Sequence, residues 1–314
     1  MNYKESTLKR FVKDYSLPVQ VYTNDMLLYY IDLYDTIYHT KDKWRMFEDA
    51  VNQCGGEDEF ISYTNELTNH IVNTIKDTTA YKEFINCDID TIIPVNDSIE
   101  GIKYVKSSNI YTPNNHGKYF VSFDLKKANY QALRGFSKGI VLDTDSYEEL
   151  IEQFTDMEYV KHSKYIRQVI FGNLNMNRIT RQERFLNEWV LHWLINTGYP
   201  KDKIIVFTTD EIIIECQPQM FLGNGVCEVI EKSIYNYTGL DVKVEDFKLK
   251  YIGNNTYVKE HTSKVPTFKG GSAIYFPQAY KAYMNIPLED RDLLFMYEKQ
   301  LAKFVKPLEW IGID

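Results

Sequence analysis

The chain has 314 residues, a formal net charge of −8, and 44% hydrophobic, 15% aromatic and 25% charged residues. This composition is typical of a globular protein and excludes the disordered and collagen-like classes. Four widely separated cysteines without a CxxC pair argue against a zinc ribbon and a disulfide scaffold. With no long apolar run, the sequence predicts a cytoplasmic protein that has no membrane segment.

The first 117 residues predict a mainly helical region. Between Asn24 and Lys76, apolar residues recur mostly at helical spacing. From Thr91 to His116, proline and glycine interrupt the pattern and predict connecting structure with short strands.

Residues 118–262 predict a core of strands and helices. Lys118–Leu125 (KYFVSFDL) is typical of a strand, and a helix should follow up to Gly135. Thr180 and Glu183 have the spacing of a capping box, which predicts a long helix over Arg181–Thr197.

The second half of this core predicts two hairpins around a helix. The run KIIVFTTDEIIIEC places Thr-Thr-Asp-Glu between two apolar strands. A helix is expected over Val226–Tyr237, and strands over Val242–Tyr251 and Thr256–Glu260. Residues 263–314 predict a helical region that ends in an amphipathic helix over Leu288–Val305. The expected fold class is α+β, with an antiparallel sheet packed on helices.

Two carboxylate positions carry the chemistry. Asp124 ends the first strand, and Asp210 with Glu211 occupies the turn of the first hairpin. If these strands are neighbours, the aspartates can hold two divalent cations about 3.5–4 Å apart, as metal-assisted phosphoryl transfer requires.

Three segments carry a family resemblance over roughly residues 118–217. VFTTDEIIIE (Val206–Glu215) resembles motif C of family A DNA polymerases, with Asp210 and Glu211 at its acidic pair and Thr209 where that family usually has His. FVSFDL resembles motif A, whose final Asp matches Asp124, although the DLKKANY run is also similar to motif A of reverse transcriptases.

The third segment, RQVIFG, is similar to the core of the family A fingers helix. The resemblance implies that Arg167 binds triphosphate and that Phe171 stacks near the base. Lys164 lies three residues earlier on the same helical face, and this spacing predicts that it can also reach phosphate. It also implies that Asn129 or Tyr130 forms the gate that excludes a ribose 2′-hydroxyl. The usual tyrosine one turn beyond the phenylalanine is replaced by Asn175.

Each feature also has an ordinary structural interpretation. Asp124 could cap a helix, because Asp favours that position, and a Thr-Asp-Glu turn is common in hairpins. Lys164 and Arg167 could form a solvated face, and Glu215 is more typical of a strand end than of a metal ligand. Basic residues nevertheless gather in the middle of the chain, at Lys126, Lys127, Arg134, Lys138, Lys161, Lys164, Arg167, Arg178, Arg181 and Arg184.

The resemblance predicts a polymerase-palm-like sheet in a small viral nucleic-acid polymerase of DNA replication, with a helical N-terminal region and a C-terminal helical extension. It implies a nucleotidyltransferase that extends a 3′ end from nucleoside triphosphates with Mg²⁺ or Mn²⁺ at Asp124 and Asp210, and Glu211 assisting. Partners would be a primer-template and a protein that aids processivity. The alternatives are a non-catalytic viral nucleic-acid-binding or assembly protein with a degenerate palm, and a transferase that needs no template.

Overall fold

The computed structural model describes residues 2–94, 98–218, 223, 225–262 and 264–311. The architecture is α+β, and its centre is a six-stranded sheet whose strands follow the order β4-β5-β3-β6-β7-β8. Each neighbouring pair in this sheet is antiparallel. The predicted fold class is confirmed at this level, namely an antiparallel sheet packed on helices.

The strands of the sheet come from one continuous part of the chain. They are β3 (Tyr119–Leu125), β4 (Ile204–Phe207), β5 (Glu211–Cys216), β6 (Val242–Gly253), β7 (Thr256–His261) and β8 (Thr267–Gly270). Both predicted hairpins are present, as β4–β5 and β6–β7. Asn254 and Asn255 both have positive φ at the tight turn of the second hairpin, a conformation that Asn tolerates well.

Helices precede the sheet and are inserted between its strands. The N-terminal ones are α1 (Glu5–Asp14), α2 (Asn24–Tyr38), α3 (Thr40–Cys54), α4 (Glu57–Asp77), α5 (Thr79–Asn86) and α6 (Ile89–Ile92). Between β3 and β4 lie α7 (Ala128–Phe136), α8 (Tyr147–Glu152), α9 (Glu158–His162), α10 (Lys164–Gly172) and α11 (Met176–Asn196), and α12 (Val226–Thr238) follows β5. The helical N-terminal region is confirmed, as are the short strands β1 (Ser98–Ile99) and β2 (Ile102–Lys103) of the connecting segment.

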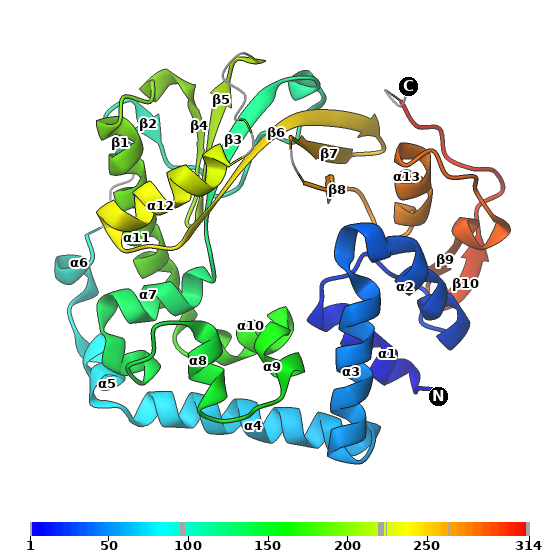
Figure 1. Ribbon diagram of the computed structural model, residues 1–314, viewed down its shortest axis with the longest axis horizontal. Coiled ribbons are helices and arrows are strands. Elements are labelled where there is room, and N and C mark those ends of the chain that lie inside the picture. Colours follow the sequence, from blue (N-terminus) through cyan, green and yellow to red (C-terminus); the bar gives the residue numbers. More distant parts are fainter. Residues whose placement is uncertain (1, 95–97, 219–222, 224, 263, 312–314) are drawn as a thin grey trace.

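In Figure 1 the sheet lies at the top, and the long helix α4 runs along the bottom. Helices α7, α11 and α12 lie at the left, while α1–α3 and the C-terminal elements lie at the right. A large aromatic cluster joins the N-terminal helices to the α8–α10 segment, for example through Phe47, whose ring centroid is 5.5 Å from that of Tyr159. The helices before and after β3 therefore share one core.

The two faces of the sheet have different surroundings. Val121, Phe123 and Ile212 pack with apolar residues of α11 and α12. Phe120 and Ile213, which alternate with them along the strands, pack on the other face with Ile110 of the connecting segment. The even-numbered residues of β3, Asp124 among them, therefore point away from the α11–α12 layer.

The predicted C-terminal helix over Leu288–Val305 is wrong. This part of the chain forms a 3-10 turn followed by a hairpin of β9 (Leu294–Tyr297) and β10 (Gln300–Lys303). Glu298 and Lys299 both have positive φ at its turn. Over residues 264–311, the expected C-terminal helical extension is thus reduced to one α-helix, α13 (Phe276–Tyr283).

Two other predicted boundaries need correction. The long helix α11 begins at Met176, five residues before the predicted Arg181, because the Asn175 side chain caps it by accepting from the Arg178 amide. Thr180 therefore lies inside the helix. The predicted boundary at residue 262 falls within the sheet, since β8 pairs with β7 beyond it.

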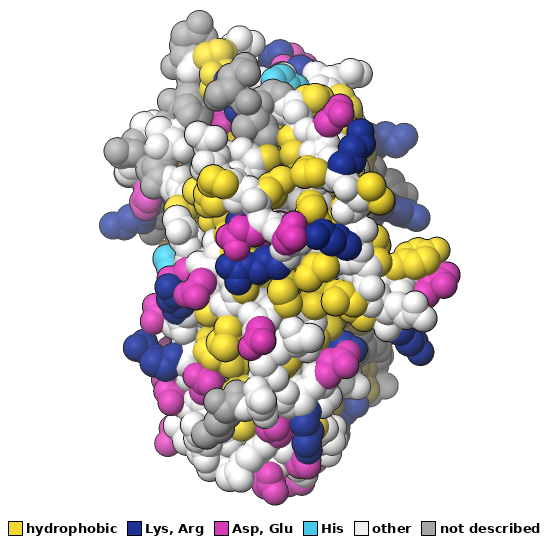
Figure 2. Space-filling view, turned by 90° about the vertical axis from the view of Figure 1, so that its right-hand side faces the viewer, with side chains coloured by type: hydrophobic (Ala, Val, Ile, Leu, Met, Phe, Trp, Pro, Cys, Tyr) yellow, Lys and Arg dark blue, Asp and Glu magenta, His cyan; other side chains and the backbone are white. Residues whose placement is uncertain are grey.

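Figure 2 shows the face formed by the right-hand side of Figure 1, where apolar side chains lie among pairs of opposite charge. Exposed apolar residues of α2 and the C-terminal segments include Leu28, Leu288, Tyr297, Leu301 and Val305. Within the described ranges, no helix combines the length and the apolar character needed to span a lipid bilayer. All four cysteines have free thiols.

Candidate functional site

Strand pairing brings the three predicted carboxylates to one end of the sheet. Asp124 on β3 lies directly opposite Glu211, the first residue of β5. The Leu125 amide donates a 2.9 Å hydrogen bond to the carbonyl of Asp210, which fixes the hairpin turn beside the end of β3. The sequence predicted this juxtaposition, and the register of β3 on β5 produces it.

The turn that carries Asp210 is held from both sides. The Thr208 hydroxyl accepts from the Glu211 amide at 3.0 Å, and the Asn187 side chain of α11 donates to the Thr208 carbonyl at 3.0 Å. Thr209 shares a 3.0 Å hydrogen bond with the Tyr104 hydroxyl. Asp210 itself is exposed at the tip, so its carboxylate is available to a ligand.

The carboxylates influence one another. Burial raises the pKa of Asp124 to about 7, and the charges of Asp210 and Glu211 add to the rise. Burial also raises the pKa of Glu211, and the Lys259 ammonium opposes that rise. A site that makes carboxylates hard to ionise is a site that a cation would stabilise.

A fourth carboxylate, which sequence reasoning missed, lies beside Asp210. Glu183 of α11 is 6% exposed, and its carboxylate accepts a 2.7 Å hydrogen bond from the Asn129 amide of α7. Burial and the Asp210 charge raise the pKa of Glu183 to about 7. The spacing of Glu183 from Thr180 predicts a capping box, whereas the structure places Glu183 inside the helix. A glutamate on the apolar side of a long predicted helix was the sequence signal that could have indicated its role in the site.

A buried lysine also belongs to the site. Lys259 of β7 is 3% exposed, and its ammonium lies 3.7 Å from a Glu211 carboxylate oxygen and 4.3 Å from the centroid of the Phe247 ring. Burial lowers the pKa of Lys259, whereas the charges of Glu211, Glu245 and Asp124 raise it. The sequence offered no sign that a lysine two strands away from β3 would reach this cluster.

The donor set agrees in chemistry with a hard divalent cation. Among the residues described, no group of three or more His, Cys, Asp or Glu side chains has the arrangement of a metal cage. Mg²⁺, however, is usually held by one or two carboxylates together with substrate phosphates, not by a complete protein cage. Asp124 and Asp210 offer that pair. Burial, and after it the charges of Asp210 and Glu211, raise the pKa of Asp124, and a bound cation would offset both effects.

Two residues predicted to contact the nucleotide are buried in the core. Phe171 is 0% exposed and packs on Tyr147, so its ring is not available to a base. Tyr130 is 3% exposed, and its hydroxyl donates to the Thr144 carbonyl at 2.9 Å. Of the two gate candidates, only half-buried Asn129 lies at the acidic cluster, through its bond to Glu183.

The predicted phosphate-binding residues lie on α10. Lys164 is exposed, and the Arg167 guanidinium lies 5.7 Å from the centroid of the Tyr147 ring. The buried Arg167 Nε has no hydrogen-bond partner among the described residues, which leaves a donor to be satisfied by a ligand or by water. Arg178 and Arg181 donate instead to carbonyl oxygens at the ends of α5 and α6, so they tie helices together.

A cavity of about 200 Å³ lies where the start of α7 approaches α8. Lys127 borders it with a positive φ, and its ammonium is 5.6 Å from the Tyr147 ring centroid and bonds Glu148. The Tyr147 ring is thus near both Lys127 and Arg167. The cavity is lined by Lys126, Lys127, Tyr130, Gln131, Arg134, Asp145, Ser146, Tyr147, Glu148 and Asp241.

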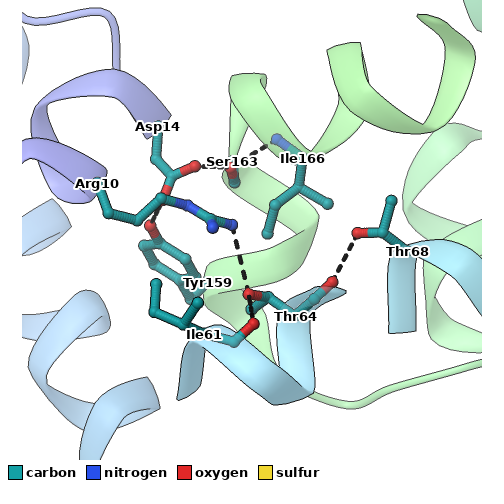
Figure 3. Close-up of polar contacts among 8 residues, drawn as sticks. All are labelled: Arg10, Asp14, Ile61, Thr64, Thr68, Tyr159, Ser163 and Ile166. Carbon is teal, nitrogen blue, oxygen red and sulfur yellow. Dashed lines mark hydrogen bonds and ion pairs between the residues drawn. The ribbon is translucent and has the colours of Figure 1, made fainter. Parts of the chain in front are cut away.

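A buried polar network fixes the start of α10 (Figure 3). The Asp14 carboxylate of α1 accepts from Arg10 at 2.9 Å, from the Ser163 hydroxyl at 2.9 Å and from the Tyr159 hydroxyl. Ser163 in turn caps α10 by accepting from the Ile166 amide at 3.0 Å. The N-terminal helix α1 therefore positions the helix that presents Lys164 and Arg167.

Comparisons with protein-family models, curated protein sequences and solved structures return no match to this chain. The function of the protein is therefore inferred from the site geometry and from the motif resemblance.

Proposed function

We propose that this protein is a palm-type nucleotidyltransferase that extends a nucleic-acid 3′ end from nucleoside triphosphates. The observation that carries the proposal is the register of β3 on β5, which sets Asp124 opposite Glu211 and beside Asp210. Half-buried Asp124 at a strand end and exposed Asp210 at the adjacent turn are two carboxylates side by side, as metal-assisted phosphoryl transfer needs.

The proposed reaction joins the 3′-hydroxyl oxygen to the α-phosphorus and releases pyrophosphate. A bound Mg²⁺ or Mn²⁺ would supply charge neutralisation at the attacking and leaving oxygens. Asp124 and Asp210 would hold the cations, and the motif resemblance predicts two of them. Glu211 would orient the site. The hydroxyl proton would pass to solvent or to a neighbouring carboxylate, and catalysis would consist largely of positioning.

Phosphate binding is assigned to Lys127, which lines the cavity between α7 and α8, and to Arg167 and Lys164 of the neighbouring helix α10. Arg167 has an unsatisfied Nε, Lys127 and Arg167 both lie near the Tyr147 ring, and exposed Lys164 begins the same helix α10. Guanidinium and ammonium groups are the usual partners of triphosphate oxygens. These positions support a nucleotide between α10 and the carboxylates.

The proposal extends to the substrates of the protein and to the process in which it acts. The substrates would be a primer-template and nucleoside triphosphates, in DNA replication of a virus within the host cytoplasm. A protein partner would supply processivity.

Primer extension tests the proposal. Labelled primers would be offered to the wild type on DNA templates, on RNA templates and without template, in Mg²⁺ or Mn²⁺. Asp124→Asn removes a proposed ligand, and Asp202→Asn, at an exposed position in the turn before β4, is the matched control. We expect extension by the wild type and the control, and its loss in Asp124→Asn.

A non-catalytic nucleic-acid-binding or assembly protein is the competing function. The burial of Phe171 and Tyr130 and the Lys259–Glu211 ion pair are the observations that favour it. Absence of extension by folded wild-type protein under every template and metal, together with retention of a labelled oligonucleotide in a filter-binding assay, would establish this alternative. Extension without template would point to a template-independent transferase.

A further inference from the structure

The acidic cluster contains its own buried cation, and this bears on how many metal ions it can hold. We propose that the Lys259 ammonium, paired with Glu211, supplies the positive charge that a second divalent cation would bring to the cluster, so that the site binds a single divalent ion at Asp124 and Asp210. The inference rests on the proposed function, because it assigns the charges of that same site.

The position of Lys259 carries the argument. It is 3% exposed on β7, and its ammonium lies 3.7 Å from the Glu211 carboxylate. Glu211 is directly opposite Asp124. The ammonium therefore lies inside the cluster of carboxylates, and burial limits its exchange with solvent.

The surrounding charges explain why a lysine is retained at this place. Glu211, Glu245 and Asp124 all interact favourably with the Lys259 ammonium, and the Phe247 ring lies under it at 4.3 Å. A buried ammonium without such partners would be strongly destabilising. Opposite charges and a ring face together give it a fixed position.

The fixed Lys259 ammonium reduces both the space and the negative charge that the cluster offers to metal ions. It occupies the side of the cluster formed by Glu211 and leaves Asp210, exposed at the turn, together with Asp124. A divalent ion beside Glu211 would be repelled by the ammonium and would have to displace it. The pair Asp124 and Asp210 is thus the place for one divalent ion.

The test counts bound Mn²⁺ by the loss of the free-ion signal in electron paramagnetic resonance. Lys259→Met removes the charge and keeps an apolar stem, and Lys259→Arg keeps the charge. Lys269→Met is the matched control, because Lys269 is an exposed lysine that also acts on Glu211. Lys259→Met alone leaves the Glu211 carboxylate without its ion-pair partner. The same lysine substitution is therefore also made in the background Glu211→Gln, and Glu211→Gln/Lys259→Met is compared with Glu211→Gln.

We expect one Mn²⁺ per chain in the wild type, Lys259→Arg and Lys269→Met. We expect two Mn²⁺ ions per chain in Lys259→Met. The first of them should bind at least about tenfold more tightly than the Mn²⁺ of the wild type, because a nearby positive charge has been removed. The double variant should likewise bind Mn²⁺ at least about tenfold more tightly than Glu211→Gln.

Two Mn²⁺ ions in an active wild type would overturn this inference and leave the proposed function intact. An unchanged affinity in both the single and the double variant would also overturn it. A wild type that binds no Mn²⁺ and extends no primer would overturn both.

Discussion

The side-chain amide of Asn129 donates a 2.7 Å hydrogen bond to the Glu183 carboxylate, which joins the segment after Asp124 to the long helix α11. The buried Glu183 carboxyl lies near Asp210, and burial together with the Asp210 charge raises the pKa of Glu183 to about 7. The acidic site is therefore larger than the three residues that the motifs indicate.

The first prediction concerns the pH dependence of extension. Asp124 and Glu183 both have a pKa near 7, and Asp124 must lose its proton to bind a cation. We expect kcat/KM to rise with pH through about 7. Glu183→Gln preserves an acceptor for Asn129 and removes one ionisation, so the rise should become less steep. A profile that Glu183→Gln leaves unchanged would show that Glu183 does not act on the site.

The second prediction concerns stability in the absence of metal. The pKa of Asp124 rises from 3.8 to about 7 on folding, so the folded state binds a proton more tightly than the unfolded state. Its contribution is present at low pH and is lost as pH rises towards 7. The full shift corresponds to about 4 kcal/mol, and with screening by water we expect about 2 kcal/mol.

Asp124→Asn should therefore raise the free energy of unfolding by about 2 kcal/mol at pH 7.5 and by little at pH 4.5. Urea unfolding at the two pH values measures this difference. Equal effects at both values, or destabilisation at pH 7.5, would contradict the interpretation that Asp124 is a crowded, half-buried carboxylate with a raised pKa. Asp202→Asn, on the exposed turn, serves as the control.

The third prediction concerns the network around Asp14. Asp14 is 0% exposed and accepts hydrogen bonds from Arg10, Tyr159 and Ser163. Asp14→Ala leaves the largely buried Arg10 without its carboxylate and should cost about 3–5 kcal/mol. Tyr159→Phe removes one donor and should cost about 1 kcal/mol. Thermal unfolding followed by circular dichroism measures both losses.

That network also supports α10, because Ser163 is both a partner of Asp14 and the cap of this helix. A milder variant, Ser163→Ala, should weaken nucleotide binding through Lys164 and Arg167. We expect a higher KM for nucleoside triphosphate with a smaller effect on kcat. A change confined to kcat would argue against a positioning role for α10.

The fourth prediction concerns the hairpin turn. Asn187 donates to the Thr208 carbonyl at 3.0 Å and is 1% exposed. Asn187→Ala should cost about 1–2 kcal/mol in stability and displace the turn that carries Asp210. Extension should fall more than tenfold while binding of a labelled primer is unchanged. Full activity in the folded variant would show that this contact does not position Asp210.

Much of the central sheet could be predicted from local pattern. The strand ending at Asp124 and the hairpin around Asp210 combine β-branched runs with a polar turn, and these signals agree with the final packing. The register that sets Asp124 against Glu211 depends on pairing between strands far apart in sequence. The order of the segments that resemble motifs A and C indicated that these strands pair. The pattern of apolar and polar residues within each strand could not indicate it.

The failures have physical causes. In Leu288–Val305, apolar residues suit either a helix or short strands, and tertiary contacts decide: the Gln20 side chain hydrogen-bonds both the amide and the carbonyl of Met296 at the edge of β9. Lys259 and Glu183 reach the site from other elements of the fold, so only packing reveals them. The burial of Phe171 likewise follows from its contact with Tyr147.

The most direct test of the account is primer extension by Asp210→Asn. Asp210 is exposed at the turn, so the substitution removes a proposed ligand with little effect on the fold. We predict that Asp210→Asn, folded as well as the wild type by circular dichroism, loses at least about a hundredfold in extension rate, as expected for loss of a metal-binding group, while Asp202→Asn retains full activity. Wild-type activity that persists in Asp210→Asn would contradict the assignment of this carboxylate cluster as the catalytic site.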